Sequence, residues 1–513
     1  MADMGQGAGT GLSEGRGKRA KWRRPQANAE PQPMTARSPF PMCPPRRRWT
    51  TAVAMLAAAG FALALAAGPS RAEARGLVTG FAEDNMFLSP DASTRATWFN
   101  RAVSAKAEIA RVNLYWRKVV GSSPPANPTN PADPRYDFSK FDGAVRDAHA
   151  RHLRLMITVF GAPRWAEGKN PPSQAPLGTW KPDPHALGQF AQALAKRYSG
   201  SFRGLPRVRL FEAWNEPNLS VNLTPQWVGK KPESPGRYRR MLNAFYRGVK
   251  RVQPGATVVG GATAPFGDPR THPRDPRLPR MRPLAFLRKV FCLNRRLKPG
   301  GCHAKAHLDV LSHHPINTTN PPTYRAINHD DIEVADFHKL RPLIHAAEKT
   351  GHVRPRGHHP LWATELGWYT KPPSVFGVPP SKQARWLEQG FYMLWKQGAS
   401  VAINFLLRDA PHTNVYAGSS GVFFPNGQRK PSYRSFRFPF VTHRKSKRKV
   451  GAWGKSPTSG TLKIQLRGKH GWGTLKRMHV RHGRVFTTSL RLRRAADLRA
   501  KVGTNTSLSW HQR

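Results

Sequence analysis

Acidic residues are scarce in this sequence: 29 Asp and Glu stand against 84 Lys and Arg in 513 residues, which gives a formal net charge of +55. Cysteine is also rare, at three residues, and this excludes a small scaffold held together by many disulfides. Hydrophobic residues are not scarce, because they make up 39% of the chain and include 15 Trp, so global disorder is excluded as well. A charge of this size first suggests a polyanionic partner, above all nucleic acid.

Long hydrophobic runs are almost absent, and the one that stands out is Thr51 to Ala67. It follows the basic triplet Arg46-Arg47-Arg48 and precedes Ala72-Glu73-Ala74, an order that is typical of a secretory signal peptide. A run of about 17 residues is short for a membrane span. We therefore expect residues 1–74 to be a disordered leader with a signal peptide, and the mature protein to be secreted or cell-wall associated, without stable membrane insertion.

The cysteines fit an exported protein. Cys43 lies in the expected leader, which leaves Cys292 and Cys302 ten positions apart. A local disulfide is the simplest interpretation. The nearby His303 and His307 offer a zinc site as the alternative, but the spacing is unlike that of a CxxC zinc motif. We predict the disulfide, and neither a metal nor a cofactor.

From residue 75 onward, short apolar runs alternate with amphipathic helical patterns, such as those at residues 186–198, 238–252, 334–349 and 382–397. This order predicts parallel strands joined by right-handed crossovers, and eight repeats predict a (β/α)₈ TIM barrel over residues 75–440. An open doubly wound sheet is the alternative, but it normally carries a glycine-rich phosphate loop after its first strand, where this chain has Glu83 and Asp84. The expected strands are Leu77–Phe81, Ile109–Tyr115, Leu153–Phe160, Val208–Trp214, Thr257–Ala262, Leu308–His313, Leu361–Thr364 and Val401–Leu406.

Residues 441–513 show a different pattern, with short strands between glycine turns and no helical periodicity. This predicts a small antiparallel β module. The module holds 19 Lys and Arg against one acidic residue, Asp497. Its basic run Arg444–Lys449 is interpreted as a hinge, a polyanion contact or a solvated linker. The expected strands are Thr461–Leu466, Gly473–Met478, Arg484–Leu490 and Asp497–Val502.

Two glutamates end expected barrel strands. Glu216, in Trp-Asn-Glu-Pro, ends the fourth strand, and Glu365, in Glu-Leu-Gly-Trp, ends the seventh. A barrel gathers the carboxyl ends of its strands at one mouth, so the two carboxyl groups should face each other. Cleavage of a glycosidic bond needs such a pair: an acid that protonates the leaving oxygen and a carboxylate that attacks or stabilises the sugar. A separation of about 5–5.5 Å would indicate retention of configuration, and one near 9 Å inversion.

With these motifs, the sequence resembles the retaining glycoside hydrolases of clan A, near their family 39 and family 5 branches, over about Leu77 to Phe440. The resemblance implies a double-displacement hydrolysis of O-glycosidic bonds, with Glu216 as acid/base and Glu365 as nucleophile. Like-charge repulsion from ionised Glu365 is expected to keep Glu216 protonated. Glu212, lower on the same strand, is the carboxylate that could be confused with either of them.

The resemblance also implies roles for neighbouring residues. Asn215 is expected to hydrogen-bond the sugar 2-hydroxyl, and Arg111, on the second strand, to hold the nucleophile ionised. An ordinary strand-end ion pair is the alternative for Arg111. His314 is expected near the nucleophile, with His313 as the alternative, and both histidines would otherwise be core residues.

Aromatic residues near the strand ends are candidates for stacking on sugar rings. They include Trp165, Trp214 and Trp368, although large aromatics serve as often for packing. One feature of the clan is missing, because many members carry Trp at the end of strand eight. Here Phe405 or Asn404 stands near that position.

Two further classes of function compete with a secreted glycosidase. A carbohydrate-binding or cell-wall-binding protein could keep the barrel without turnover, although both glutamates are retained. A nucleic-acid-binding protein would explain the charge, but the chain has no recognition motif and export removes most such partners. We expect a carbohydrate partner, which includes an anionic glycan or cell-wall polymer, and no nucleic acid.

Overall fold

The computed structural model describes residues 76–268, 280–410 and 418–513. The expected leader and signal peptide, residues 1–74, lie outside the described residues, as does most of the arginine-bearing loop that follows Asp268. Within the described ranges, no helix is both long and apolar enough to cross a membrane.

Eight parallel strands close into a barrel, in the order β1-β12-β11-β9-β7-β4-β3-β2. Each of the eight expected strands forms one of them, with ends that shift by a few residues, so the predicted TIM barrel is confirmed. The strands are β1 (Val78–Ala82), β2 (Ile109–Tyr115), β3 (Arg154–Phe160), β4 (Leu210–Ala213), β7 (Thr257–Thr263), β9 (Val310–His313), β11 (Leu361–Leu366) and β12 (Ala399–Phe405).

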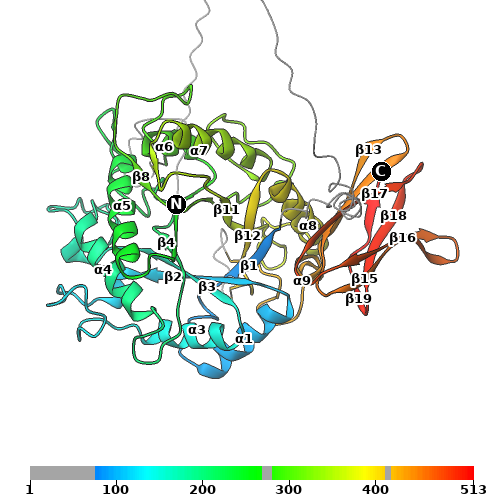
Figure 1. The fold of residues 1–513 in the computed structure, drawn as a ribbon, viewed down its shortest axis with the longest axis horizontal. Coiled ribbons are helices and arrows are strands. Elements are labelled where there is room, and N and C mark those ends of the chain that lie inside the picture. The colour runs from blue at the N-terminus through cyan, green and yellow to red at the C-terminus, as the bar shows by residue number, and fades with distance from the viewer. Residues whose placement is uncertain (1–75, 269–279, 411–417) are drawn as a thin grey trace, which may run out of the picture. The chain divides into compact units, whose positions relative to one another are not determined.

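Helices surround the barrel strands (Figure 1). The start of α4 follows ordinary capping rules: this helix begins with Pro184 after Asp183, whose side chain accepts a hydrogen bond from the amide of His185 at 2.8 Å. The helical segments are α1 (Ala92–Ser104), α2 (Trp116–Val119), α3 (Ser139–Ala150), η1 (Arg164–Ala166), α4 (Pro184–Arg197), α5 (Ser234–Val252), α6 (Pro283–Val290), η2 (Val334–Lys339), α7 (Leu340–Lys349), α8 (Pro380–Lys396) and α9 (Pro431–Arg437). Short two-residue strands in the loops are β5 (Trp227–Val228), β6 (Lys231–Pro232), β8 (Ala306–His307) and β10 (Val353–Arg354).

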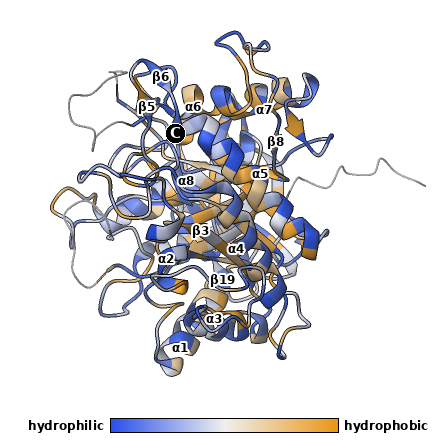
Figure 2. Ribbon diagram, turned by 90° about the vertical axis from the view of Figure 1, so that its left-hand side faces the viewer, coloured by the Kyte–Doolittle hydropathy of each residue, from blue (hydrophilic) through white to orange (hydrophobic). Residues whose placement is uncertain are grey.

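The barrel has two apolar layers. A small cluster that includes Ile109, Met156 and Val259 comes from alternate positions of the barrel strands, and a larger one joins the strands to the helices. In Figure 2, β3 is largely hydrophobic, whereas the helices around it alternate between hydrophobic and hydrophilic residues. This is the pattern expected for strands that are buried on both faces.

The last part of the chain forms antiparallel sheets, as predicted. One sheet has the order β13-β14-β17, and the other contains β16, β15, β18 and β19 with β20 paired to β18. The run Arg444–Lys449 is not a linker, because it forms the exposed turn of the β13–β14 hairpin. The strands are β13 (Phe440–Ser446), β14 (Lys449–Lys455), β15 (Gly460–Gly468), β16 (Gly471–Val480), β17 (Val485–Arg491), β18 (Ala496–Val502), β19 (Asn505–Thr506) and β20 (Trp510–Gln512).

The β module packs on the barrel. The buried Lys455 of β14 makes an ion pair with Glu108 and donates a hydrogen bond to Thr79 Oγ1 at 2.8 Å. Trp453, on the same strand, packs against Tyr392 and Trp395 of α8, with ring centroids 5.7 and 5.9 Å apart. The barrel and the β module therefore share a hydrophobic core. The domain boundary at residue 441 stays a prediction.

The disulfide between Cys292 and Cys302 forms, with the two Cα atoms 5.2 Å apart. It closes the loop that follows α6, which confirms the predicted pairing over the zinc alternative.

Glu388 of α8 is a fully buried carboxyl group whose nearest cation, Arg385 Nη1, lies 3.8 Å away. Burial raises the pKa of Glu388 from 4.5 to about 8, and Arg385 offsets only part of this. A raised pKa stabilises the fold while the group is protonated, and this stability is lost as the pH rises from 4.5 to about 8. At about pH 8, Glu388→Gln should therefore have a free energy of unfolding that is a few kcal/mol higher than that of the wild type. At about pH 4.5, the two proteins should differ little. Urea unfolding at both ends checks this, and parallel pH profiles would contradict it.

Candidate active site

Glu216 and Glu365 meet at the carboxyl ends of their strands, together with His314. Glu216 follows β4, Glu365 lies near the end of β11, and His314 directly follows β9. One side-chain atom from each of the three lies within 4.8 Å of the other two. The side chain of Glu216 is 18% exposed and that of Glu365 is 8% exposed, so both carboxyl groups are reached from the mouth of the barrel.

The backbone after β4 turns sharply to present Glu216. Trp214 and Glu216 have φ angles of +70° and +43°, in the left-handed region that costs energy for residues other than glycine. The amide of Glu216 donates to the carbonyl of Ala262 at 2.9 Å, and the amide of Trp214 donates to Val159 at 2.8 Å. Contacts with the two neighbouring strands therefore hold this conformation in the segment that follows the end of β4 at Ala213.

Arg111 of β2 is buried beneath the two carboxyl groups and donates three hydrogen bonds. Its Nη1 lies 2.5 Å from Glu365 Oε1, its Nε lies 2.8 Å from Glu212 Oε2, and its Nη2 lies 2.9 Å from Asn215 Oδ1. The planar guanidinium thus fixes two carboxylates and one amide together. Arg111 therefore does not form the ordinary ion pair at a strand end that the sequence left open as the alternative.

Glu212 is the structural carboxylate of this cluster. It is fully buried, and it accepts hydrogen bonds from Thr158 Oγ1 at 2.8 Å and Ser312 Oγ at 2.9 Å besides the Arg111 bond. Burial alone would raise the pKa of Glu212, but Arg111, His314 and these bonds bring it below the ordinary value. The hydrogen bonds from Arg111, Thr158 and Ser312 therefore favour the ionised form of Glu212, and its side chain is not exposed to solvent. Sequence reasoning missed Thr158 and Ser312, whose only signal is a polar residue within an apolar strand.

The two histidines are separated clearly by their contacts. His313 Nδ1 shares a hydrogen bond with Thr263 Oγ1 at 2.8 Å and its Nε2 lies 2.9 Å from the carbonyl of Ile332, and burial lowers the pKa of His313 to about 3. His314 Nδ1 instead lies 3.1 Å from Glu216 Oε1 and 3.8 Å from Glu365 Oε2. Burial alone would lower the pKa of His314, but the charge of Glu365 and the bond to Glu216 raise it. His314 is therefore the histidine of the site, and His313 is a neutral core residue.

Electrostatics link the members of the cluster. Burial raises the pKa of Glu365, the nearby charges of Glu216 and Glu212 add to this, and His314 and Arg111 oppose it. Burial together with the charges of Glu365 and Glu216 raises the pKa of Tyr369 to about 12, so this phenol stays neutral. The charges of Glu365, His314 and Arg111 therefore influence one another.

Glu216, His314 and Glu365 have the atom types that could hold a metal ion. Their charge environment does not favour one, because Arg111 already occupies Oε1 of Glu365 and the raised pKa of His314 favours its protonated form, which cannot bind a metal.

The three tryptophans proposed as sugar contacts differ in exposure. Trp214 and Trp368 are 1% exposed, and their indole N–H groups donate to the carbonyls of Asn222 and Asn320, each at 2.8 Å. Both are packing residues in this structure, which corrects the expectation that they offer stacking faces. Trp165, in η1, is partly buried and lies edge-on to Trp116 at 5.7 Å, so it stays a candidate subsite.

The end of β12 lacks an exposed tryptophan, and Asn404 is used within the fold. It is 2% exposed, and its Nδ2 donates to the carbonyls of Leu406 and Ser420. Phe405 is partly buried and is the aromatic side chain at this strand end.

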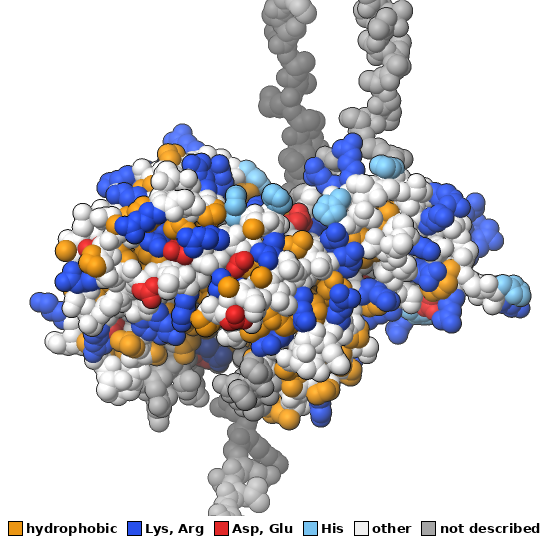
Figure 3. Space-filling view, turned by 90° about the horizontal axis from the view of Figure 1, so that it is seen from below, with side chains coloured by type: hydrophobic (Ala, Val, Ile, Leu, Met, Phe, Trp, Pro, Cys, Tyr) orange, Lys and Arg blue, Asp and Glu red, His pale blue; other side chains and the backbone are white. Residues whose placement is uncertain are grey.

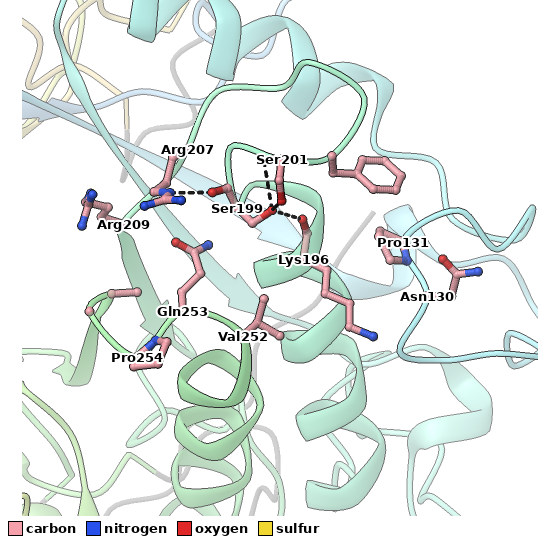
Figure 4. Close-up of a pocket in the computed structure, with 13 residues that line it drawn as sticks. Asn130, Pro131, Lys196, Ser199, Ser201, Arg207, Arg209, Val252, Gln253 and Pro254 are labelled. Atoms are coloured by element: carbon pink, nitrogen blue, oxygen red, sulfur yellow. Dashed lines mark hydrogen bonds between the residues drawn. The ribbon is translucent and has the colours of Figure 1, made fainter.

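A pocket of about 600 Å³ lies at the other end of the barrel (Figure 4). Its lining includes Arg207 and Arg209, which precede β4, and Gly255 and Ala256, which precede β7. Loops at the amino ends of barrel strands contribute to stability rather than to catalysis in this fold, so we do not place the site there.

Comparisons with known proteins agree with the architecture. No protein-family model and no curated protein matches the chain. Among solved structures, a family 39 glycoside hydrolase from the gut symbiont Bacteroides cellulosilyticus matches with a TM-score of 0.50 and 16% identity, over 82% of each chain. A glucosidase from Croceicoccus marinus matches with a TM-score of 0.47 and 14% identity, over 82% of this chain and 94% of that one. GH5_18 from Streptomyces cattleya gives a TM-score of 0.45 and 15% identity, over 71% and 79%. At these identities, the similarity to the family 39 structure shows the fold alone: this chain folds as a (β/α)₈ barrel like that of the family 39 glycoside hydrolase.

Proposed function

We propose that this protein is a secreted retaining glycosidase, in which Glu216 is the acid/base and Glu365 the nucleophile. The observation that carries the proposal is that one oxygen of the Glu216 carboxyl group and one of the Glu365 carboxyl group lie within 4.8 Å of each other at the mouth of the barrel. Inverting enzymes need a gap of about 6.5–9.5 Å to admit a water molecule, so the short distance favours retention. The disulfide between Cys292 and Cys302 supports the export part of the proposal.

In the first step, a carboxylate oxygen of Glu365 attacks the anomeric carbon, and the bond from that carbon to the leaving oxygen breaks. The proton of Glu216 passes to the leaving oxygen, so the aglycone departs as a neutral alcohol. Arg111 holds Oε1 of Glu365, which orients the attack, and the Arg111–Asn215 bond fixes Asn215 beside the sugar.

In the second step, water attacks the anomeric carbon of the glycosyl-enzyme ester and the bond to Glu365 breaks. Glu216, now ionised, accepts the proton of that water and is ready for the next cycle. Two inversions at the anomeric carbon give net retention.

The test is the stereochemistry of the first product formed from aryl glycosides. We expect wild-type protein to release the nitrophenol from at least one member of an α- and β-glycoside panel, with proton NMR showing the anomer of the substrate before mutarotation. First formation of the opposite anomer would refute retention. Binding to the panel sugars without turnover would instead favour the non-catalytic carbohydrate-binding alternative.

His314 sets the pH range of the proposed chemistry. Its positive charge lowers the pKa of Glu365, so His314→Gln should raise that pKa and move the acid limb of the kcat/KM profile to higher pH. A shift of about one pH unit corresponds to about 1.4 kcal/mol of lost interaction. The matched control is His345→Gln, since His345 is a 71% exposed histidine outside the site. An acid limb that stays in place in His314→Gln would contradict this role.

A further inference from the structure

The β module carries a row of lysine and arginine side chains across one face of its larger sheet. Lys463 of β15 is the register partner of Arg477 on β16 and of Lys501 on β18, so the three lie side by side on adjacent strands. Strands are spaced about 4.8 Å apart, which makes the row about 10 Å long. Figure 3 shows one face of the whole molecule, on which Lys and Arg side chains are widely spread and Asp and Glu side chains are few and isolated.

This face is the solvent side of the sheet. The alternate positions of the same strands, such as Leu462, Ile464 and Leu498, are fully buried in the core of the module. Side chains alternate along a strand, so the basic row points away from that core.

The positive charges of this row have no negative partners in the part of the chain that the structure describes, and their mutual repulsion destabilises the folded state. Like charges directly opposite each other in a sheet are destabilising, and none of the three has an ion-pair partner among the described residues. The one acidic residue of the module, Asp497, lies at the end of the face, near Arg467 at 3.9 Å and His511 at 2.9 Å. A face that is unfavourable in the free protein becomes favourable when anionic groups lie on it.

The same face also holds an aromatic ring. Trp472 is the register partner of Arg467, and the guanidinium of Arg499 lies 4.2 Å from its ring centroid. Arg499 Nε in turn donates to Gln465 Oε1 at 2.9 Å, which fixes the guanidinium over the ring. A partly exposed ring beside fixed cations fits a sugar ring that carries negative charge.

We propose that this face, formed by Lys463, Arg477 and Lys501 with Arg499 and Trp472, binds an anionic polysaccharide, outside the cleft of the barrel. A nucleic acid fits less well. Binding of single strands uses several aromatic platforms for successive bases, whereas this face has one ring, and reading of a duplex requires an element that enters a groove. The barrel on which the module packs also has the carboxyl pair for which we proposed sugar chemistry. This binding does not require turnover, so a failed activity test leaves it standing.

The test is binding of the full chain to polygalacturonate, with neutral dextran and a single-stranded DNA oligonucleotide as comparison probes. We expect polygalacturonate to bind, dextran not to bind, and DNA to bind more weakly at equal charge concentration. The triple variant Lys463→Gln, Arg477→Gln, Lys501→Gln should weaken polygalacturonate binding about tenfold or more at low salt, and higher salt should weaken wild-type binding. The same variant should be at least as stable as wild type, because repulsion within the row is removed.

The matched control removes three charges from elsewhere in the module. Lys445, Lys447 and Lys449 lie on the exposed β13–β14 hairpin, outside the basic row. Their triple change to glutamine should alter the affinity less than about twofold, since only unspecific long-range attraction is lost. Equal losses in the two triple variants would overturn the proposal, and so would tighter binding of the DNA than of polygalacturonate. Glu216→Gln should bind polygalacturonate like the wild type, which keeps this test separate from the chemistry of the barrel.

Discussion

Glu365→Ala is expected to reduce kcat by about 10⁴-fold or more on every substrate that the wild type hydrolyses. The reason is that this variant has no oxygen that can attack the anomeric carbon, so neither step of the double displacement can start. The loss should not depend on the leaving group, because an activated aglycone still needs an attacking group. Added azide should restore part of the turnover and give a glycosyl azide of inverted configuration, since one displacement then replaces two.

Glu216→Ala should behave differently, and this difference assigns the two roles. With a poor leaving group, loss of the acid should cost about 10²–10⁴-fold in kcat. With a dinitrophenyl glycoside, which needs no proton to depart, the first step should stay fast and the second should become slow. Intact-mass spectrometry should then show the glycosyl-enzyme on Glu365. Asp497→Asn, which removes a carboxylate of the β module, serves as control and should hydrolyse like wild type. The assignment is wrong if Glu216→Ala and Glu365→Ala respond alike to the leaving group.

The barrel itself could be predicted from the sequence because its signal is repeated. Eight apolar runs in alternation with amphipathic stretches constrain one another, so an error of one residue at the start of Leu153–Phe160, or of two residues at the start of Val208–Trp214, does not change the architecture. The β13–β14 hairpin was missed for the opposite reason. Its turn is a run of charged residues, which in sequence resembles a solvated linker, and only pairing with β17 makes it part of a sheet.

The sequence predicted where the residues of the candidate site lie along the barrel strands, but it did not predict which way every side chain points. Glu216 follows a barrel strand, and Glu365 and Arg111 lie in barrel strands, so their positions follow from the closed barrel. Side-chain direction did not follow: Trp214 and Trp368 stand next to the site in sequence, yet both are buried. Their burial goes with tertiary contacts that no pattern of residues reports, such as the hydrogen bonds from their indole groups to the carbonyls of Asn222 and Asn320.

Arg111→Gln should be the most destabilising change in the barrel. It leaves the fully buried Glu212 and the 8% exposed Glu365 without their shared cation, and an uncompensated buried charge costs about 3–5 kcal/mol. Arg111→Lys should recover part of this, because an ammonium group keeps the charge but cannot reach Glu212, Glu365 and Asn215 with one planar fork. Urea unfolding measures both. Arg164→Gln, which breaks an ion pair whose arginine is 60% exposed, is the control and should change stability by less than about 1 kcal/mol.

The pH dependence of this effect separates lost charge from lost packing. In the wild type, Arg111 helps to hold the pKa of Glu212 below its ordinary value, so this carboxylate stabilises the fold above about pH 4.5 and that contribution is lost as the pH falls. Without Arg111, burial should dominate and the pKa of Glu212 should rise above the ordinary value. The stability gap between wild type and Arg111→Gln should then widen as the pH increases from about 4 to 7, and adding Glu212→Gln should close part of it at the upper end. A gap that is constant with pH would mean that Arg111 acts through packing alone, and its assignment as the counter-cation of the two glutamates would fail.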